Sequence, residues 1–189
     1  MVICMKKVLL LLGDYAEDYE VMIPYQILKY ADIEADCVAP DRLPKDTIRT
    51  AIHDFLGDMT YRESEGHRFI INADFNQIKL QEYDGLYITG GRAPEYLRLN
   101  KKVLDIVKYF FELDKPVAAI CHGIQILTAA DVVKERVLTC YPAVAPEVAM
   151  AGGVYLPMDS DKAIRDGNLV TSPAWPGIAE LMKQFIAIL

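Results

Sequence analysis

The residues best suited to covalent chemistry are a cysteine followed directly by histidine and glycine. A short apolar run, Val117–Ile120, leads into Cys121, His122 and Gly123, and a helical pattern follows. This order predicts a sharp strand-to-helix turn, which exposes its side chain above a sheet and which the glycine allows to close. A helix N-terminus favours negative charge, so we expect a lowered thiol pKa and a reactive thiolate at Cys121.

The remaining cysteines give no such signal. Cys4, Cys37 and Cys140 form no Cys-x-x-Cys pair, and we interpret them as core or surface thiols. The three histidines show no zinc-ligand spacing with them, so we expect no metal and no organic cofactor.

Two further segments follow expected strands. Gly90 and Gly91 would let a backbone N–H approach a ligand closely, and Gly91 could bind an oxyanion together with the N–H of His122. An ordinary strand-to-helix turn is the alternative. The segment Asp14–Glu20 is acidic at an expected helix start, where the helix dipole alone accounts for acidic residues.

Alternation of short apolar runs with longer stretches of helical period predicts an α/β fold. We expect a three-layer sandwich, with a mostly parallel twisted sheet and helices on both faces, of flavodoxin-like or class I glutamine amidotransferase-like type. Active sites in such sheets lie at the carboxyl ends of the strands. The expected strands are Lys7–Leu12, Glu34–Ala39, Asp84–Thr89, Pro116–Ile120 and Asn168–Thr171, with a short edge strand at Ile70–Ile71. The expected helices are Glu17–Tyr30, Lys101–Leu113, Gly123–Ala130 and Gly177–Leu189.

The length of 189 residues favours one domain over residues 1–189. Residues 41–73 are the least regular part, and we expect an insertion that forms a loop or a small hairpin. Such segments are often functional, but an ordinary surface insertion explains the composition equally well. His53 lies in it and could reach the site from there, although a surface or hairpin position is favoured.

Composition restricts the partners. The net charge is −7 and there is no run of Lys or Arg, which argues against nucleic-acid binding. No apolar stretch approaches the length of a membrane span, and the N-terminus lacks the features of a signal peptide. We therefore expect a cytoplasmic protein that does not bind membranes and whose thiols are reduced.

Several motifs together resemble the ThiJ/PfpI superfamily, also called the DJ-one superfamily, and the resemblance spans nearly the whole chain. These motifs are Ala119–Gln125, Thr89–Asn100, Asp14–Glu20, Thr139–Pro142 and Asp166–Ser172. The segment Ala51–Tyr61 further resembles the plant-type branch, which includes glutathione-independent glyoxalases made of two fused copies of this domain.

The resemblance implies roles for individual residues. Cys121 matches the nucleophile, Glu17 the carboxylate that hydrogen-bonds the thiol, and His122 the residue after the nucleophile. Gly91 matches the second oxyanion donor. Glu95 matches a carboxylate that a neighbouring subunit presents to the histidine, which implies at least a dimer.

Tyr15, Tyr141, Pro173 and Trp175 flank the matched motifs, and we name them as candidate pocket residues, with core packing as the alternative. No histidine follows His122, so the chemistry of class I amidotransferases is not expected.

The resemblance leaves three functions open. The first is a glutathione-independent glyoxalase or deglycase that acts on a small carbonyl substrate such as methylglyoxal, with Glu17 or His122 as the base. The second is an intracellular cysteine peptidase of the PfpI type. The third is a non-enzymatic redox sensor or chaperone, since an exposed thiolate oxidises readily.

Overall fold

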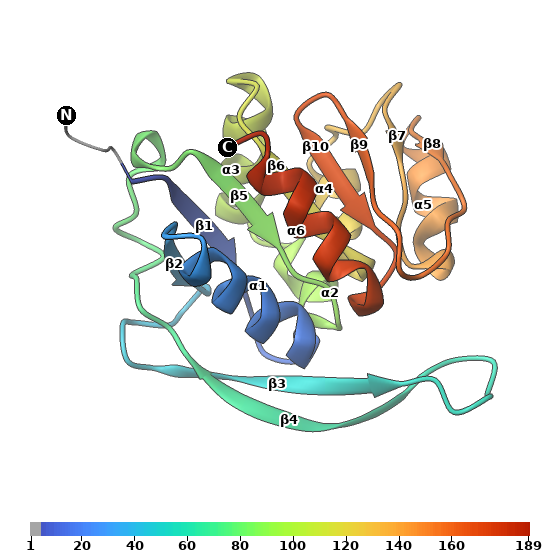
Figure 1. Ribbon diagram of the computed structural model, residues 1–189, viewed down its shortest axis with the longest axis horizontal. Helices are drawn as coiled ribbons and strands as arrows, with labels where there is room; N and C mark the ends of the chain where they lie inside the picture. The colour runs from blue at the N-terminus through green and yellow to red at the C-terminus, as the bar shows by residue number, and fades with distance from the viewer. Residues whose placement is uncertain (1–4) are drawn as a thin grey trace.

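A six-stranded sheet forms the centre of the molecule, which we describe in a computed structural model covering residues 5–189 (Figure 1). Cys4 lies outside the described residues. The first five strands along the sheet are parallel, and the last pairs antiparallel at the edge. In spatial order the strands are β2 (Glu34–Val38), β1 (Lys7–Leu11), β5 (Gly85–Ile88), β6 (Val117–Ile120), β10 (Leu169–Ser172) and β9 (Ile164–Asp166).

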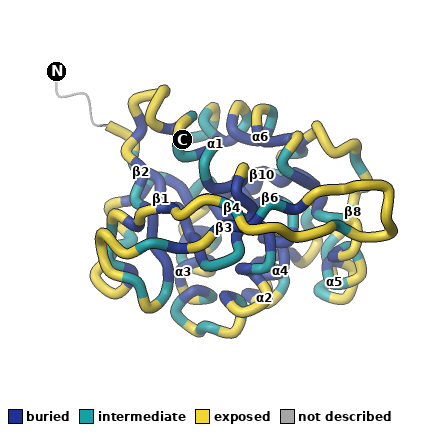
Figure 2. The backbone as a smooth tube through the Cα atoms, turned by 90° about the horizontal axis from the view of Figure 1, so that it is seen from below, coloured by how far each residue is buried: buried dark blue, intermediate teal, exposed yellow. Residues whose placement is uncertain are grey.

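Helices cover both faces of this sheet, as both views show (Figures 1 and 2). One face carries α1 (Asp18–Tyr30) and α6 (Ile178–Ile186), and the other carries α2 (Ala93–Leu97), α3 (Lys101–Glu112) and α4 (Ile124–Ala129). Beyond β9, α5 (Ala145–Met150) packs beside β7 (Val137–Leu138) and β8 (Val154–Tyr155). Four short 3-10 helices complete the elements: η1 (Leu80–Glu82), η2 (Cys121–Gly123), η3 (Pro142–Val144) and η4 (Trp175–Gly177). The predicted three-layer α/β fold is confirmed.

The sequence explains why these layers form. β5, β6 and β10 are buried along their whole length, because helices cover both of their faces. Helix α3 buries Val103, Ile106, Val107 and Phe110, a spacing that places all four on one face. The Asn100 side chain accepts hydrogen bonds from the first turn of this helix and fixes its start.

Residues 41–73, expected to be irregular, contain a long antiparallel hairpin. Its strands are β3 (Thr47–Asp54) and β4 (Arg62–Ile70), so Ile70 ends a hairpin strand and does not start an edge strand of the central sheet. The hairpin crosses below the carboxyl ends of the central strands (Figures 1 and 2). It is held there by backbone hydrogen bonds from Tyr15 N to Arg49 O and from Ala51 N to Ala16 O. The segment therefore covers the edge of the sheet at which a site is expected.

The short strands β7, β8 and β9 were not expected from the sequence, because two or three residues give no measurable period. Within residues 5–189, no helix is both long and apolar enough to cross a membrane.

Candidate active site

Cys121 lies at the turn between β6 and α4, in the sharp geometry that the sequence predicts. Its φ is 58°, a left-handed value that is uncommon and strained for a residue with a side chain. Gly90 makes room for it, since a Cβ atom at Gly90 would lie 2.6 Å from Cys121 Cβ and 2.9 Å from His122 N. The thiol is thus held above the ends of β5 and β6.

The carboxyl group closest to this thiol belongs to Glu20, which corrects the expected contact of Glu17. Glu20 is fully buried in α1, and its Oε2 accepts a hydrogen bond of 2.8 Å from the Gly90 N–H. Burial, followed by the charge of Glu17, raises the pKa of Glu20 well above its usual value, against the opposing hydrogen bonds of Gly90 and the Cys121 thiol. Glu20 therefore carries a proton at neutral pH.

The thiol pKa is raised, whereas the sequence led us to expect a lowered one. Burial is the largest cause of the raised pKa of Cys121, and the neighbouring Glu20 adds to it. Hydrogen bonds from the N–H groups of Gly91 and His122 oppose the shift. The helix N-terminus does not outweigh burial, so Cys121 rests as a thiol. The two N–H groups named as oxyanion donors both point at its sulfur.

His122 is placed to take the proton of that thiol. Its Nδ1 lies 3.3 Å from Cys121 Sγ, and its ring stacks on Tyr141 with centroids 4.6 Å apart. Burial and the charge of His53 lower the pKa of His122 to about 4, although Glu147 opposes the shift. The imidazole is therefore neutral at physiological pH, and a neutral ring nitrogen can accept a proton.

Glu17 pairs with His53 and not with the thiol. Glu17 Oε2 lies 2.6 Å from His53 Nδ1, and the His53 backbone N–H donates to the same oxygen at 3.0 Å. On the other side of the ring, Nε2 lies 3.0 Å from Glu63 Oε2, and Arg92 donates to both oxygens of Glu63. Burial alone would lower the pKa of His53, but the hydrogen bonds and charges of Glu17 and Glu63 raise it. Glu17 and Glu63 thus favour the protonated form of His53, whose two ring nitrogens face them.

His53 lies in the hairpin, as one of the expected positions had it, but its side chain is buried and not on the surface, and a β-bulge lies beside it. The register of β3 on β4 shifts between Arg49 and Ala51. Before the shift the buried residues are Ile48 and Thr50, and after it they are Ala51 and His53. An extra residue in one strand reverses which side chains face inward. Strict alternation read from the sequence therefore places His53 on the wrong face.

A small cavity contains these groups. Its free volume is about 10 Å³, room for a single water molecule. The hairpin closes it with Phe55 and Tyr61, whose rings pack near Tyr141 at centroid distances of 6.1 and 5.9 Å. The lining residues are Glu17, Glu20, His53, Phe55, Tyr61, Gly91, Cys121, His122, Tyr141, Ala174 and Trp175.

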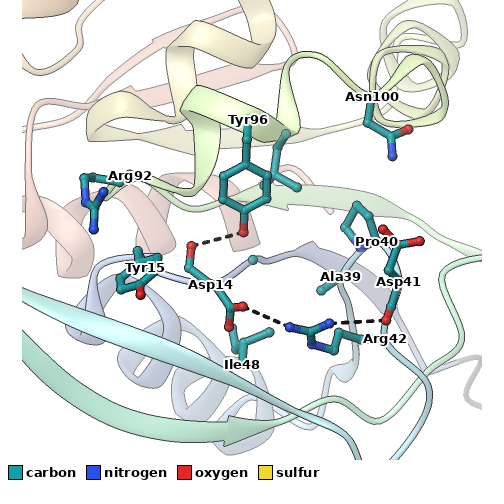
Figure 3. A pocket seen from close by; sticks show the side chains of 12 residues that line it. Asp14, Tyr15, Ala39, Pro40, Asp41, Arg42, Ile48, Arg92, Tyr96 and Asn100 are labelled. Atoms are coloured by element: carbon teal, nitrogen blue, oxygen red, sulfur yellow. Dashed lines mark hydrogen bonds and ion pairs between the residues drawn. The ribbon is translucent and has the colours of Figure 1, made fainter.

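The other predicted site residues lie at varying distances from this cavity. Tyr141 and Trp175 line it, whereas Pro173 lines an adjoining pocket. Tyr15 lies in a separate cleft, with the Arg92 guanidinium 4.5 Å from its ring centroid (Figure 3). Glu95 is exposed on α2. Within residues 5–189, no group of three or more His, Cys, Asp or Glu residues is arranged to hold a metal ion.

Sequence reasoning missed Glu20, His53, Phe55, Tyr61 and Glu63. Glu20 had a signal, because it lies one helical turn after Glu17 and so on the same face of the helix. The other four belong to the hairpin, whose inward face depends on the bulge.

The fold and this turn define a class of α/β proteins with a buried cysteine at a strand-to-helix elbow. The sequence matches the DJ-1/PfpI family over residues 6–188, and the chain belongs to that family.

Protein DJ-1 homolog D of Arabidopsis thaliana is 51% identical over 185 residues, which cover 97% of this chain and 48% of that protein. A protein named as a deglycase in Pyrococcus abyssi is 34% identical over 185 residues, 97% of this chain and 99% of that protein. The chain therefore spans about half the length of the Arabidopsis relative and nearly all of the archaeal one.

Solved structures show the same fold. Drosophila melanogaster DJ-1beta superposes with a TM-score of 0.77 and 22% identity, over 97% of this chain and 89% of that one. A two-domain protein from Anabaena variabilis, with DJ-1/ThiJ/PfpI-like and ferritin-like domains, superposes with a TM-score of 0.79 and 27% identity, over 96% of this chain and 47% of that one.

Proposed function

We propose that this protein is a cysteine-dependent enzyme that converts α-oxoaldehydes such as methylglyoxal into α-hydroxy acids without glutathione, or removes such groups from their adducts. Deglycase-named relatives support a glyoxalase or deglycase type of activity. The observation that carries the proposal is the grouping of Cys121, His122 and Glu20 in one closed cavity, with the N–H groups of Gly91 and His122 directed at the sulfur.

The first step is addition of the thiol to the aldehyde. Cys121 gives its proton to His122 Nδ1 as its sulfur bonds to the aldehyde carbon. The electron pair of the C=O bond moves to oxygen, where the N–H groups of Gly91 and His122 stabilise the charge. Glu20, which carries a proton, then protonates this oxygen and becomes a carboxylate. The product is a hemithioacetal.

The second step moves a hydrogen between the two substrate carbons. The Glu20 carboxylate is a strong base, because burial raises its pKa. It removes the proton from the former aldehyde carbon, while protonated His122 gives its proton to the ketone oxygen, and an enediol forms. Glu20 returns the proton to the former ketone carbon. It then receives the proton of the hydroxyl group on the former aldehyde carbon, which becomes the carbonyl carbon of a thioester on Cys121.

Water completes the reaction. It attacks the thioester carbon, its proton passes to His122, and the sulfur leaves and is reprotonated from His122. The net change is addition of one water to R–CO–CHO to give R–CHOH–COOH. No external oxidant or reductant is consumed.

The pair of Glu17 and His53 contributes by position and charge. The His53 ring lies on the cavity wall between two carboxylates that favour its protonated form, as described above. A fixed positive charge there stabilises the negative charge of the enediolate. We assign His53 and Glu17 as positioning residues, with Glu20 in the acid–base role that the sequence attributed to Glu17.

A cysteine peptidase remains a second candidate because Cys121 and His122 are within reach of each other. It is less favoured because the relatives named as deglycases point to carbonyl chemistry. A redox role is also less favoured, since the raised pKa of Cys121 opposes oxidation. Assembly into a dimer that brings a partner's Glu95 towards His122 stays a prediction.

The direct test is formation of D-lactate from methylglyoxal in the absence of glutathione. The wild-type protein should turn over, and Cys121→Ala should reduce kcat/KM to background. Cys140→Ala, another buried cysteine outside the cavity, is the matched control and should retain activity. Absence of turnover in the wild-type protein would reject the glyoxalase activity, and full activity in Cys121→Ala would reject the cysteine mechanism.

A further inference from the structure

A second pocket adjoins the cavity at Cys121. Its free volume is about 330 Å³, within the lower range of small-molecule pockets. It shares Phe55, Tyr141, Ala174 and Trp175 with the thiol cavity, so these four residues form a common wall. The remaining lining residues are Pro142, Met158, Ser160, Pro173 and Pro176. None of the nine lining residues carries a charge.

The free volume at the thiol, about 10 Å³, does not hold a whole substrate. The rest of any substrate must extend past the common wall into a neighbouring space. Two such spaces are lined in part by Trp175. One is the uncharged pocket, and the other, of about 260 Å³, is lined by Glu17, Asp18, His53 and His67 among others.

The chemistry of the two spaces separates their occupants. Transfer of an uncharged apolar group from water into the apolar pocket is favourable. In the space lined by charged residues, the same group would displace the water that solvates those residues, which is unfavourable. A charged group in the apolar pocket would lose hydration without gaining a partner.

The walls of the apolar pocket come from four separate segments. The Phe55 ring lies at the hairpin end, 6.1 Å from the Tyr141 ring at an angle of 34°. Trp175 packs edge-on against Tyr19, with centroids 5.3 Å apart, which restrains its ring. Aromatic rings and prolines form a stiff wall suited to a flat or branched apolar group.

We propose that this pocket is a specificity subsite that binds the apolar substituent R of an α-oxoaldehyde R–CO–CHO. The enzyme therefore prefers branched aliphatic and aromatic α-oxoaldehydes to methylglyoxal and discriminates against charged substituents. This inference rests on the proposed function for its substrate class, and on the uncharged pocket beside Cys121 for the choice of substituent.

The kinetic test compares methylglyoxal, isobutylglyoxal and phenylglyoxal by initial rates. Each methylene group buried in the pocket should raise kcat/KM about fourfold. Met158→Glu places a carboxylate in the pocket and should lower the ratio of kcat/KM for isobutylglyoxal to that for methylglyoxal about tenfold. Met150→Glu is the matched control, since Met150 is 87% exposed on α5, and it should leave the ratio unchanged.

A binding measurement tests the subsite without relying on turnover. Trp175 is the only tryptophan in the chain and lies in the common wall, so its fluorescence reports occupancy. D-mandelate, the product from phenylglyoxal, should bind at least tenfold more tightly than D-lactate. Met158→Glu should reduce this ratio of affinities. Both ligands carry one carboxylate, so repulsion by the added charge affects both and cancels in the ratio.

The outcomes separate the two proposals. Turnover of methylglyoxal with no gain for larger substituents, or equal binding of mandelate and lactate, would overturn the subsite and leave the glyoxalase function intact. Selective binding of mandelate that Met158→Glu abolishes, without turnover of any α-oxoaldehyde, would support the subsite and reject the function.

Discussion

Two hollows at the carboxyl ends of the strands differ in size and in electrostatics. The larger, about 500 Å³, is lined by Asp14, Tyr15, Arg42, Arg92 and Tyr96 among others (Figure 3). The cavity at Cys121 has about 10 Å³. Volume alone would place the chemistry in the first.

Both arginines of the large cleft are paired within the protein. Arg42 Nη2 lies 2.9 Å from Asp14 Oδ2, and Arg92 is bound to Glu63. The Tyr96 hydroxyl donates to the Asp14 carbonyl at 3.0 Å. Among the residues that the structure describes, the cleft therefore offers no unpaired arginine to a ligand.

The small cavity differs because burial leaves its groups far from their ordinary protonation behaviour. The pKa values of Cys121 and Glu20 are raised, and that of His122 is lowered to about 4. Perturbed groups that face one another in a closed space are typical of active sites. The comparison teaches that displaced protonation equilibria locate the chemistry better than empty volume does.

The largest expected effect comes from replacing one acidic residue in each hollow, which tests whether the chemistry lies in the cavity at Cys121 or in the large cleft. Glu20→Gln keeps an oxygen for the Gly90 N–H but removes the exchangeable proton. General acid–base groups contribute about 100- to 10,000-fold to a rate, so kcat/KM for methylglyoxal should fall by that factor.

Asp14→Asn is the matched change in the large cleft and should leave kcat/KM within about twofold, because Asp14 does not line the thiol cavity. Both variants should be checked for cooperative unfolding. An active Glu20→Gln protein would remove Glu20 from the proposed mechanism, and an inactive but folded Asp14→Asn protein would move the site towards the large cleft.

A second prediction concerns the pH dependence that His53 imposes. Burial opposes the shift, but Glu17 and Glu63 raise the pKa of His53, so His53 loses its proton at a higher pH than a free histidine does. Activity that depends on the imidazolium should therefore fall on the alkaline side. Glu63→Gln removes one of the two carboxylates, so the alkaline limb of kcat/KM should move to lower pH.

Glu65→Gln, an exposed acid on the same strand, is the control and should leave the limb in place. Stability should follow the same sign. The stabilisation from the His53 pair is fully present below the unfolded pKa of about 6.5 and is lost as pH rises through the raised folded pKa. Urea unfolding at mildly acidic and alkaline pH would measure it. An alkaline limb that does not move in Glu63→Gln would show that His53 does not control activity.

The sequence contains enough information for the fold and for the cysteine turn. Buried parallel strands read as continuous apolar runs, and a strand followed by Cys-His-Gly and a helix has few geometries open to it. Those signals are local. The direction of the Cys121 pKa shift was not accessible, because it depends on burial and on Glu20, two features produced by tertiary packing.

The remaining site residues depend on contacts between distant segments. Glu17 and Glu20 lie one turn apart, and only the position of the hairpin decides that Glu17 pairs with His53 while Glu20 faces the thiol. The register shift between β3 and β4, whose extra residue lies in β4 opposite Thr50, accompanies the change that turns His53 inward. For such residues the sequence gives candidates, and the fold selects among them.

The smallest expected effect comes from the ion pair of the large cleft. The side chains of Arg42 and Asp14 are 34% and 20% exposed, and pairs of this kind contribute about 0–1 kcal/mol to stability. Arg42→Gln should therefore lower the free energy of unfolding in urea by less than about 1 kcal/mol. It should leave kcat/KM and the preference among α-oxoaldehydes unchanged, because Arg42 touches neither the thiol cavity nor the apolar pocket. A large loss of activity with little loss of stability would mean that the large cleft takes part in binding substrate, and the contrast between the two hollows would then fail.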